Sequence, residues 1–211
     1  MRVALVDYGS GNLHSAAKAL ALSGREAGAE IEVTSAPATI ARADRIVLPG
    51  DGAFPACRAA LEAEPGLIEA LQDAVLGRGV PFMGICVGMQ LLASVGHEYT
   101  DTPGLGWIAG AIERITPSDP ALKVPHMGWN DLHFRQAHPV FDGIADGDHA
   151  YFVHSYQFRP ADPAHLIASV DHGGSVCAIV GRDNILGLQF HPEKSQAVGL
   201  RILANFMRWQ P

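Results

Sequence analysis

The sequence predicts an α/β fold with a mostly parallel, open sheet that helices cover on both faces. Short apolar runs alternate with helical patterns in the first half of the chain, an order typical of a parallel sheet. One of these runs ends at a cysteine where a helix begins. In the second half, short strands are broken by glycine, proline and aspartate, which predicts additional antiparallel strands.

The first half of the chain is expected to contain four strands. Asn12 is a good N-cap for the first long helix, which stops at Ser23 and Gly24. A further short helix starts directly after Cys86. The predicted strands are residues 3–6, 31–34, 46–48 and 80–85, and the predicted helices are residues 13–22, 56–62, 67–76 and 87–93.

The second half is expected to add strands and to end in an amphipathic helix, residues 197–209. The predicted strands are residues 112–115, 151–158, 166–170, 176–180 and 185–190. The chain has no long linker, internal repeat or low-complexity segment. We therefore expect residues 1–211 to form one domain.

Composition and charge exclude several classes of protein. The net charge is −7, and no run of lysine and arginine stands out, so nucleic acid and anionic membranes are poor partners. No apolar stretch reaches the roughly 18 residues of a membrane span. The first residues turn polar too early for a signal peptide. We expect a soluble, cytoplasmic protein.

The three cysteines do not predict a disulfide framework or a zinc site. Their number is odd, and no two form a C-x-x-C pair. Cys57 and Cys177 are expected to be small buried hydrophobic residues, which is how free cysteine usually behaves. We expect no metal and no cofactor.

Cys86 occupies the most informative position in the sequence. It ends a buried apolar strand and precedes a helix, with Gly84 and Gly88 two residues away on either side. This is the G-x-nucleophile-x-G spacing of a nucleophile elbow, with cysteine in place of serine. The sharp turn strains the backbone and crowds its neighbours, and glycines relieve the clash. We expect Cys86 to be a nucleophile, whose thiolate form the helix N-terminus behind it favours.

His191 and Glu193 are the expected partners of this cysteine. A thiolate nucleophile needs a group that manages protons, and that group needs an orienting partner. His191 follows an apolar strand, and residues two apart in an extended segment point to the same side, which places Glu193 beside the ring. Pro192 stiffens the pair. A His-Pro-Glu stretch alone would indicate a turn at a strand end, but with the cysteine it predicts a Cys-His-Glu triad.

Residues 49–53 follow a central strand and are expected to form part of an oxyanion hole. The stretch lacks the known phosphate-binding patterns, so phosphate binding has no direct support. Glycine lets backbone N–H groups approach an oxyanion closely, and the expected donors are the amides of Gly52 and Val87. An ordinary tight turn is the alternative for this loop.

Together these residues resemble the triad-type glutamine amidotransferase domains, whose sheet is flavodoxin-like. The resemblance rests on residues 84–90, with residues 49–52 upstream and residues 191–193 downstream. It runs from residue 5 to about residue 206. Within this family, the chain is most similar to the glutaminase subunits of imidazole glycerol phosphate synthase. That similarity rests on residues 7–13, 124–130, 151–156 and 189–195.

The resemblance implies that Cys86 attacks the side-chain amide of glutamine, and that ammonia and glutamate are released. The residues that it implies for holding the bound glutamine are Gly50, Gln90, Ser155 and Tyr156. From the residues alone, Gln90 could be a solvated residue in a first helical turn. Ser155 and Tyr156 could likewise belong to a half-buried strand with a polar face.

Asp51 departs from the family pattern, which usually has a small apolar residue at this place. A carboxylate that pointed into the oxyanion hole would oppose the developing charge, so we expect the Asp51 side chain to face away. The glycines on both sides let the loop change conformation at low cost. We therefore expect low glutaminase activity in the isolated chain, and higher activity when a liganded partner docks.

The resemblance also implies a partner, because it covers nearly all of the chain and leaves no sequence for a domain that accepts ammonia. In this family the partner is a (β/α)8-barrel cyclase subunit, which makes imidazole glycerol phosphate and a carboxamide ribonucleotide for purine synthesis. We expect a heterodimer with that subunit. The implied docking residues are Asn12, Met127, Trp129, Asn130 and Lys194. Trp129 could instead be a core aromatic residue.

Three other functions stay open. The first is a glutaminase of another amidotransferase, such as those that serve GMP, anthranilate or pyridoxal phosphate synthesis; residues 125–130 and 151–156 argue against it. The second is a cysteine hydrolase or peptidase on the same type of sheet, but Gln90 and the His-Pro-Glu stretch favour glutamine. The third is an interaction subunit with a dead site, which the intact triad opposes.

Overall fold

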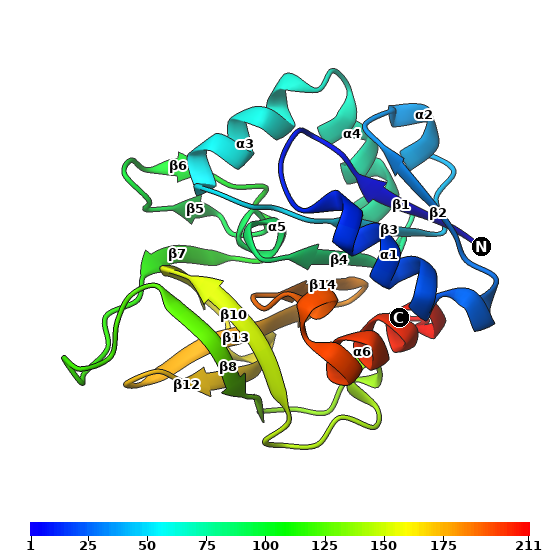
Figure 1. The fold of residues 1–211 in the computed structure, drawn as a ribbon. Helices are drawn as coiled ribbons and strands as arrows, with labels where there is room; N and C mark the ends of the chain where they lie inside the picture. Colours follow the sequence, from blue (N-terminus) through cyan, green and yellow to red (C-terminus); the bar gives the residue numbers. More distant parts are fainter.

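A sheet of eight strands forms the centre of the computed structural model, which describes residues 1–211 (Figure 1). The strand order is β2-β1-β3-β4-β14-β13-β12-β9. The first five strands of this order run parallel, and each of the last three is antiparallel to the strand before it. The bounds are β1 (Arg2–Val6), β2 (Glu30–Thr34), β3 (Arg45–Leu48), β4 (Phe82–Ile85), β9 (His133–Phe134), β12 (Leu166–Asp171), β13 (Ser175–Arg182) and β14 (Ile185–Leu188).

The middle of the chain forms two smaller sheets. One is an antiparallel pair of β8 (His126–Asp131) and β10 (His149–His154), which lies at the front of the molecule in Figure 1. The other has four strands in the order β11-β7-β5-β6. Their bounds are β5 (Val95–Gly96), β6 (Thr102–Pro103), β7 (Gly110–Arg114) and β11 (Tyr156–Pro160).

Helices lie on both sides of the central sheet (Figure 1). On one side α1 (Leu13–Ser23) packs against α6 (Gln196–Arg208). On the other side α4 (Leu67–Gln72) contacts both α2 (Pro37–Ile40) and α3 (Phe54–Ala63). The short helix α5 (Val87–Gln90) follows β4 directly. The remaining turns are 3₁₀ segments at Arg25–Ala27, Pro139–Phe141, Pro163–His165 and Pro192–Lys194, and a π-helical turn at Asp73–Gly77.

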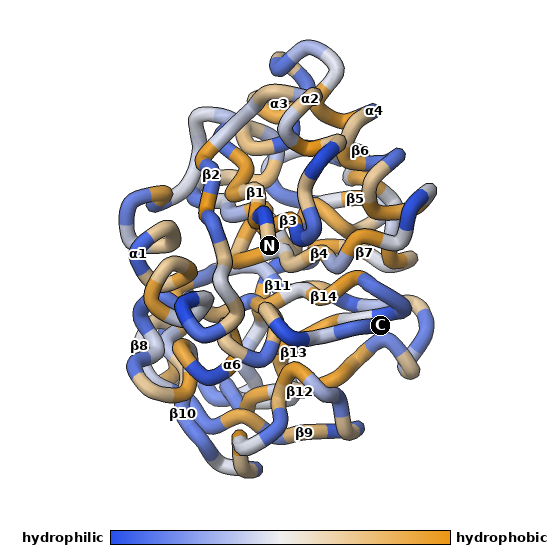
Figure 2. Tube along the Cα trace, turned by 90° about the vertical axis from the view of Figure 1, so that its right-hand side faces the viewer, coloured by the Kyte–Doolittle hydropathy of each residue, from blue (hydrophilic) through white to orange (hydrophobic).

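The central strands are buried on both faces. Every residue of β3, β4 and β14 is buried, which explains why these strands read as short continuous apolar runs rather than alternating ones. Figure 2 shows the same concentration of hydrophobic residues along β1, β3 and β4. None of the helices combines the length and apolar character that crossing a bilayer requires.

The structure confirms the predicted α/β fold and corrects three details of it. The sequence predicts one strand over 151–158, but β10 ends at His154 and β11 starts at Tyr156 in a different sheet. Aromatic residues lie on both sides of the break, so composition does not reveal it. The pattern predicts an antiparallel strand at β14, yet this strand also pairs parallel with β4. Strand β8 is unpredicted, because it is only partly buried and contains a glycine.

Candidate active site

Three neighbouring parallel strands bring the predicted site together. The loop of residues 49–53 follows β3, Cys86 follows β4, and His191 lies shortly after β14. The carboxyl ends of parallel strands meet at one edge of a sheet, which is where sites form in open α/β sheets. The Cys86 amide donates a 2.8 Å hydrogen bond to the Leu188 carbonyl, so the β4 and β14 ends are held in register. The parallel direction of β14 is therefore what delivers His191 to the cysteine.

The backbone of Cys86 is strained, as the elbow spacing predicts. Its φ is 55° and its ψ is −114°, a conformation that residues with a side chain rarely adopt. A Cβ atom on Gly84 would lie 2.5 Å from the Gly88 carbonyl oxygen. A Cβ atom on Gly88 would lie 1.9 Å from the Leu48 carbonyl oxygen. Both glycines are thus required because β3, β4 and α5 approach one another too closely for any side chain.

His191 and Glu193 form a buried pair beside this turn. The His191 Nδ1 atom lies 2.8 Å from Glu193 Oε1, and the two side chains are 8% and 4% exposed. Burial of the ring lowers the pKa of His191, but hydrogen bonds to Cys86 and Glu193, together with their charges, outweigh burial and raise it to about 10. The ring therefore holds a proton at neutral pH. Ser195 fixes the turn, since its hydroxyl donates to the His191 carbonyl at 2.7 Å.

A pocket of about 260 Å³ opens at Cys86. Its volume is below the roughly 300–1,000 Å³ of sites for drug-sized ligands, which suits a small polar substrate. Its walls contain these predicted site residues: Gly52, Cys86, Val87, Gln90, Ser155 and Tyr156. They also contain residues that the sequence did not single out for binding: Asp51, Glu98, Pro125, Val153 and His154.

Gln90 is buried in the wall of this pocket and is not a solvated residue. Its Nε2 atom donates to the Tyr156 carbonyl at 3.3 Å and to Gln189 Oε1 at 3.1 Å. The Gln189 amide in turn places its Nε2 atom 3.8 Å from the Cys86 sulfur. A chain of amides thus joins the pocket wall to the Cys86 sulfur.

The loop before α3 is held in one conformation by Ser10. The Asp51 amide donates to the Ser10 hydroxyl oxygen at 3.1 Å, and that hydroxyl donates to the Asp51 carbonyl at 2.8 Å. The Cys57 thiol also donates to this carbonyl, at 3.2 Å. Gly50 is packed too tightly for a side chain, with Gly88 N only 2.7 Å from the place of a Cβ atom. The Asp51 amide is therefore occupied, and Gly52 (φ +97°) is the freer point of the loop.

The comparisons with known proteins identify the family of the chain. Residues 4–209 match the family described as glutamine amidotransferase class-I. The imidazole glycerol phosphate synthase subunit HisH of Ruegeria pomeroyi is 63% identical, and that of Rhodospirillum rubrum is 60% identical; each alignment covers both chains completely. The chain belongs to the class-I glutamine amidotransferase family.

Solved structures show that the fold of this amidotransferase is shared by distant relatives. A structure described as glutamine amidotransferase gives a TM-score of 0.71 at 17% identity and covers 97% of each chain. A putative GMP synthase protein from Thermoplasma acidophilum gives a TM-score of 0.68 at 19% identity, covering 99% of this chain and 92% of the other. At such identities the likeness supports the fold alone.

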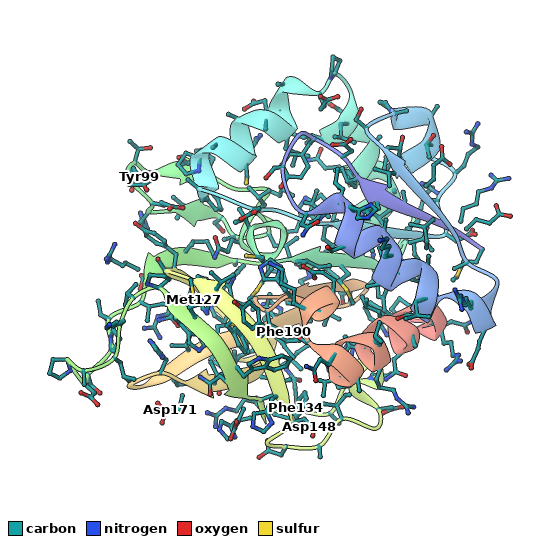
Figure 3. All side chains as sticks on the ribbon, viewed as in Figure 1. Tyr99, Met127, Phe134, Asp148, Asp171 and Phe190 are labelled. Carbon is teal, nitrogen blue, oxygen red and sulfur yellow. The ribbon has the colours of Figure 1, made fainter.

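The expected docking residues of the amidotransferase divide into two groups. Met127 and Trp129 are 62% and 47% exposed on β8, so Trp129 is not a core aromatic residue (Met127 is marked in Figure 3). Lys194 is exposed as well. Asn12 is exposed, but its side chain accepts a hydrogen bond from Ser15 N as the N-cap of α1. Asn130 turns inward, where it contacts a buried histidine.

Two residues of the amidotransferase site carry no sequence signal of their own. Glu98 follows β5 in a turn and lines the pocket, and its Oε2 atom accepts a 2.7 Å hydrogen bond from Phe54 N at the start of α3. Gln189 is fully buried and reads as part of an apolar strand. Only the folded chain shows that Glu98 lines the pocket and that the Gln189 amide lies beside Cys86. The carboxylate of Asp51 is on an exposed residue at the pocket rim, and its direction stays a prediction.

Proposed function

We propose that Cys86, His191 and Glu193 are the catalytic triad with which this chain hydrolyses glutamine, as the glutaminase subunit of imidazole glycerol phosphate synthase in histidine biosynthesis. One observation carries the proposal: the strained Cys86 turn, which lines a small pocket together with Gln90, is hydrogen-bonded to His191 of the buried His191–Glu193 pair. Relatives that match the whole chain at 55–63% identity are named as this subunit.

In the first half of the reaction, the Cys86 sulfur attacks the side-chain amide carbon of glutamine. The carbonyl oxygen becomes an oxyanion, which the amides of Val87 and Gly52 stabilise. The C–N bond then breaks while His191 gives its proton to the leaving nitrogen. Ammonia departs, and a γ-glutamyl thioester stays on Cys86.

In the second half, water attacks the thioester. His191, now neutral, takes a proton from the water as its oxygen bonds to the thioester carbon. The C–S bond breaks, glutamate leaves, and the Cys86 sulfur is restored. Throughout the reaction, the His191 Nδ1–H group donates a hydrogen bond to Glu193. This bond fixes the tautomer of the ring and stabilises its charged form.

The ammonia passes to a (β/α)8-barrel cyclase subunit that docks on this chain in a heterodimer. Exposed large apolar side chains such as Met127 and Trp129 are typical interface anchors, and Lys194 adds a positive charge close in sequence to the triad. Of the other expected docking residues, Asn12 caps α1 and Asn130 lies on the inner face of β8, so both act in docking by holding these elements in place. The cytoplasmic location expected from the sequence stays a prediction.

The test is glutamate release from glutamine, measured with and without the barrel subunit and its nucleotide substrate. We expect slow release from the isolated chain and at least roughly tenfold faster release in the liganded complex. Equal turnover in both conditions would overturn the activation. Activation instead by the acceptor subunit for GMP, anthranilate or pyridoxal phosphate synthesis would assign the chain to another amidotransferase.

Glu98 is expected to bind the α-ammonium group of glutamine. The Glu98→Gln variant keeps the shape of the side chain and an oxygen for Phe54 N, but removes the charge. A hydrogen bond to a charged group contributes about 1.5–3 kcal/mol, so KM for glutamine should rise about 10- to 100-fold while kcat changes little. The control is Glu113→Gln, on an exposed strand residue that pairs with Arg159 outside the pocket. An unchanged KM in Glu98→Gln would remove this residue from the glutamine site.

Ser10→Ala is expected to raise the activity of the isolated chain. The variant loses the two hydrogen bonds between Ser10 and Asp51, each worth about 0.5–1.5 kcal/mol, and keeps only that from Cys57, so the loop gains freedom to present its amides to the oxyanion. We expect about tenfold faster basal glutamate release and a smaller ratio of activation by the partner. Ser118→Ala is the control, because that hydroxyl also bonds a backbone carbonyl but lies far along the chain. Unchanged basal release in Ser10→Ala would show that Ser10 does not restrain the loop.

A further inference from the structure

A second pair of buried histidines lies outside the triad and has no role in the chemistry described above. His126 is 4% exposed and His154 is 6% exposed. The His126 Nδ1 atom lies 2.9 Å from His154 Nε2. His126 comes from β8 and His154 from β10, where the two residues face each other across the antiparallel ladder. The pair therefore joins β8, which carries the exposed Met127 and Trp129, to β10, whose last residues line the pocket.

The neighbours of the two rings fix the direction of every hydrogen bond. Asn130 Nδ2 donates to His126 Nε2 at 3.0 Å and to the Asp171 carbonyl at 2.9 Å, while its oxygen accepts from Asp131 N at 2.8 Å. His126 must then donate from Nδ1 to His154 Nε2. His154 donates from Nδ1 to the Tyr156 carbonyl at 2.8 Å. Each ring thus has one donor and one acceptor, as a neutral imidazole has.

Burial keeps both rings in this neutral form. It lowers the pKa of His126 to about 4 and the pKa of His154 to about 3. At neutral pH the chain Asn130–His126–His154–Tyr156 carbonyl is uncharged, and all of its donors point in one direction. Hydrogen bonds aligned in this way polarise one another, and breaking one link leaves its neighbours unpaired in a buried place.

The chain continues into the glutamine pocket. The Tyr156 carbonyl that His154 holds also accepts from Gln90 Nε2 at 3.3 Å. Gln90 in turn bonds Gln189, whose amide lies 3.8 Å from the Cys86 sulfur. The position of one carbonyl group therefore sets the position of the pocket-wall amide.

The other end of the chain lies beneath the exposed face of β8. Side chains alternate along a strand, so Met127 and Trp129 point outward while His126, on the opposite face, points inward. The Trp129 ring also packs edge-on against Tyr151 of β10, with 5.9 Å between ring centroids. Any molecule that binds Met127 and Trp129 therefore contacts the β8–β10 pair of strands, which carries both histidines.

We propose that His126 and His154 are positioning residues that couple the Met127–Trp129 face to the glutamine pocket, by setting the Tyr156 carbonyl and through it the Gln90 amide. The inference rests on the proposed function, because it assigns the docked barrel subunit to that face. His154 is part of the pocket wall and His126 lies behind it, and we assign neither a step of the reaction. They act by holding Gln90 and the pocket wall where glutamine binds.

The test is His126→Phe in the complete, liganded complex. Phenylalanine keeps a flat ring against Phe152, with which His126 stacks at 4.9 Å, but removes both nitrogens. KM for glutamine should rise about tenfold with a smaller change in kcat, and the activation ratio should fall. The matched control is His172→Phe, whose ring packs on His126 at 4.4 Å but lies outside the chain of hydrogen bonds. The proposal would be overturned if the KM of His126→Phe for glutamine were within about twofold of the values for the parent protein and for His172→Phe.

A second measurement on the unmodified protein keeps the inference testable if the variant fails to fold. In ¹⁵N-labelled protein the ring N–H signals of His126 and His154 should both come from Nδ1 and should exchange slowly with water. Addition of the liganded barrel subunit should shift both signals. Signals that stay in place on docking, or that come from Nε2, would overturn the coupling.

These experiments distinguish a failure of the proposed glutaminase function from a failure of the histidine coupling. If the parent protein released no glutamate with the barrel subunit, the proposed function would be wrong. If the parent were active and activated, but neither the KM of His126→Phe nor the ring signals changed, only the histidine coupling would be wrong.

Discussion

Replacing Cys86 by alanine should abolish glutamine hydrolysis and leave the rest of the complex working. Cys86 is the nucleophile of the proposed triad, because its sulfur stands on the elbow beside the His191–Glu193 pair, and alanine offers no atom that could form the acyl intermediate. Removal of a triad nucleophile lowers kcat by about 10⁴-fold or more. Glutamate release by the complex with its nucleotide substrate is the measurement.

Two comparisons make this result specific to the nucleophile. Synthesis from added ammonium should be retained in the Cys86→Ala complex, because the acceptor reaction needs ammonia and not its source. Cys177→Ala should keep its turnover, since burial raises the pKa of that thiol to about 12 and it lies in β13 away from the pocket. Retained hydrolysis in Cys86→Ala, or loss of ammonium-dependent synthesis in that variant, would contradict the assignment.

Gly88→Ala should damage both the fold and the activity. The added Cβ atom would lie 1.9 Å from the Leu48 carbonyl oxygen and 3.2 Å from the Pro49 carbonyl carbon, so the backbone of β3 or α5 must move. Overpacking of this kind costs about 3 kcal/mol at the upper end of its usual range. The midpoint of thermal unfolding should fall by roughly 6–12 °C for a chain of this size.

The same displacement should also lower the activity of the folded fraction. Helix α5 carries the Val87 amide and begins just after Cys86, and a shift of about 1 Å in a catalytic group can cost on the order of 100-fold in rate. Gly77→Ala is the matched control, because the nearest atom to its Cβ would be a flexible Asp73 carboxylate oxygen at 3.4 Å. Equal unfolding midpoints for the two variants would contradict the steric account of the elbow.

The elbow and the neighbouring His191–Glu193 pair could be predicted because they leave local marks in the sequence. Gly84 and Gly88 lie at fixed offsets from Cys86, and His191 and Glu193 are two residues apart after an apolar strand. The lack of room for a side chain at Gly84 follows from a short stretch of chain. The 2.8 Å contact between the His191 ring and the Glu193 carboxylate does so too. Glu98 and Ser10 left no such mark, because neighbours distant in sequence determine what each side chain meets.

Local patterns in the chain were sufficient for the α/β class and for the family to which the protein belongs, and they singled out Cys86, His191 and Glu193 as the candidate triad. They consist of strand and helix periodicity and of backbone conformations that only certain residues tolerate. The pairing of distant strands was visible only in the folded molecule. The parallel pairing of β14 with β4 brings His191 to Cys86, and the break at Ser155 lets β10 pair with β8. Such pairings join residues far apart in the chain, so only the packed sheet shows that His126, on the strand of the exposed Trp129, contacts His154 in the wall of the pocket at Cys86.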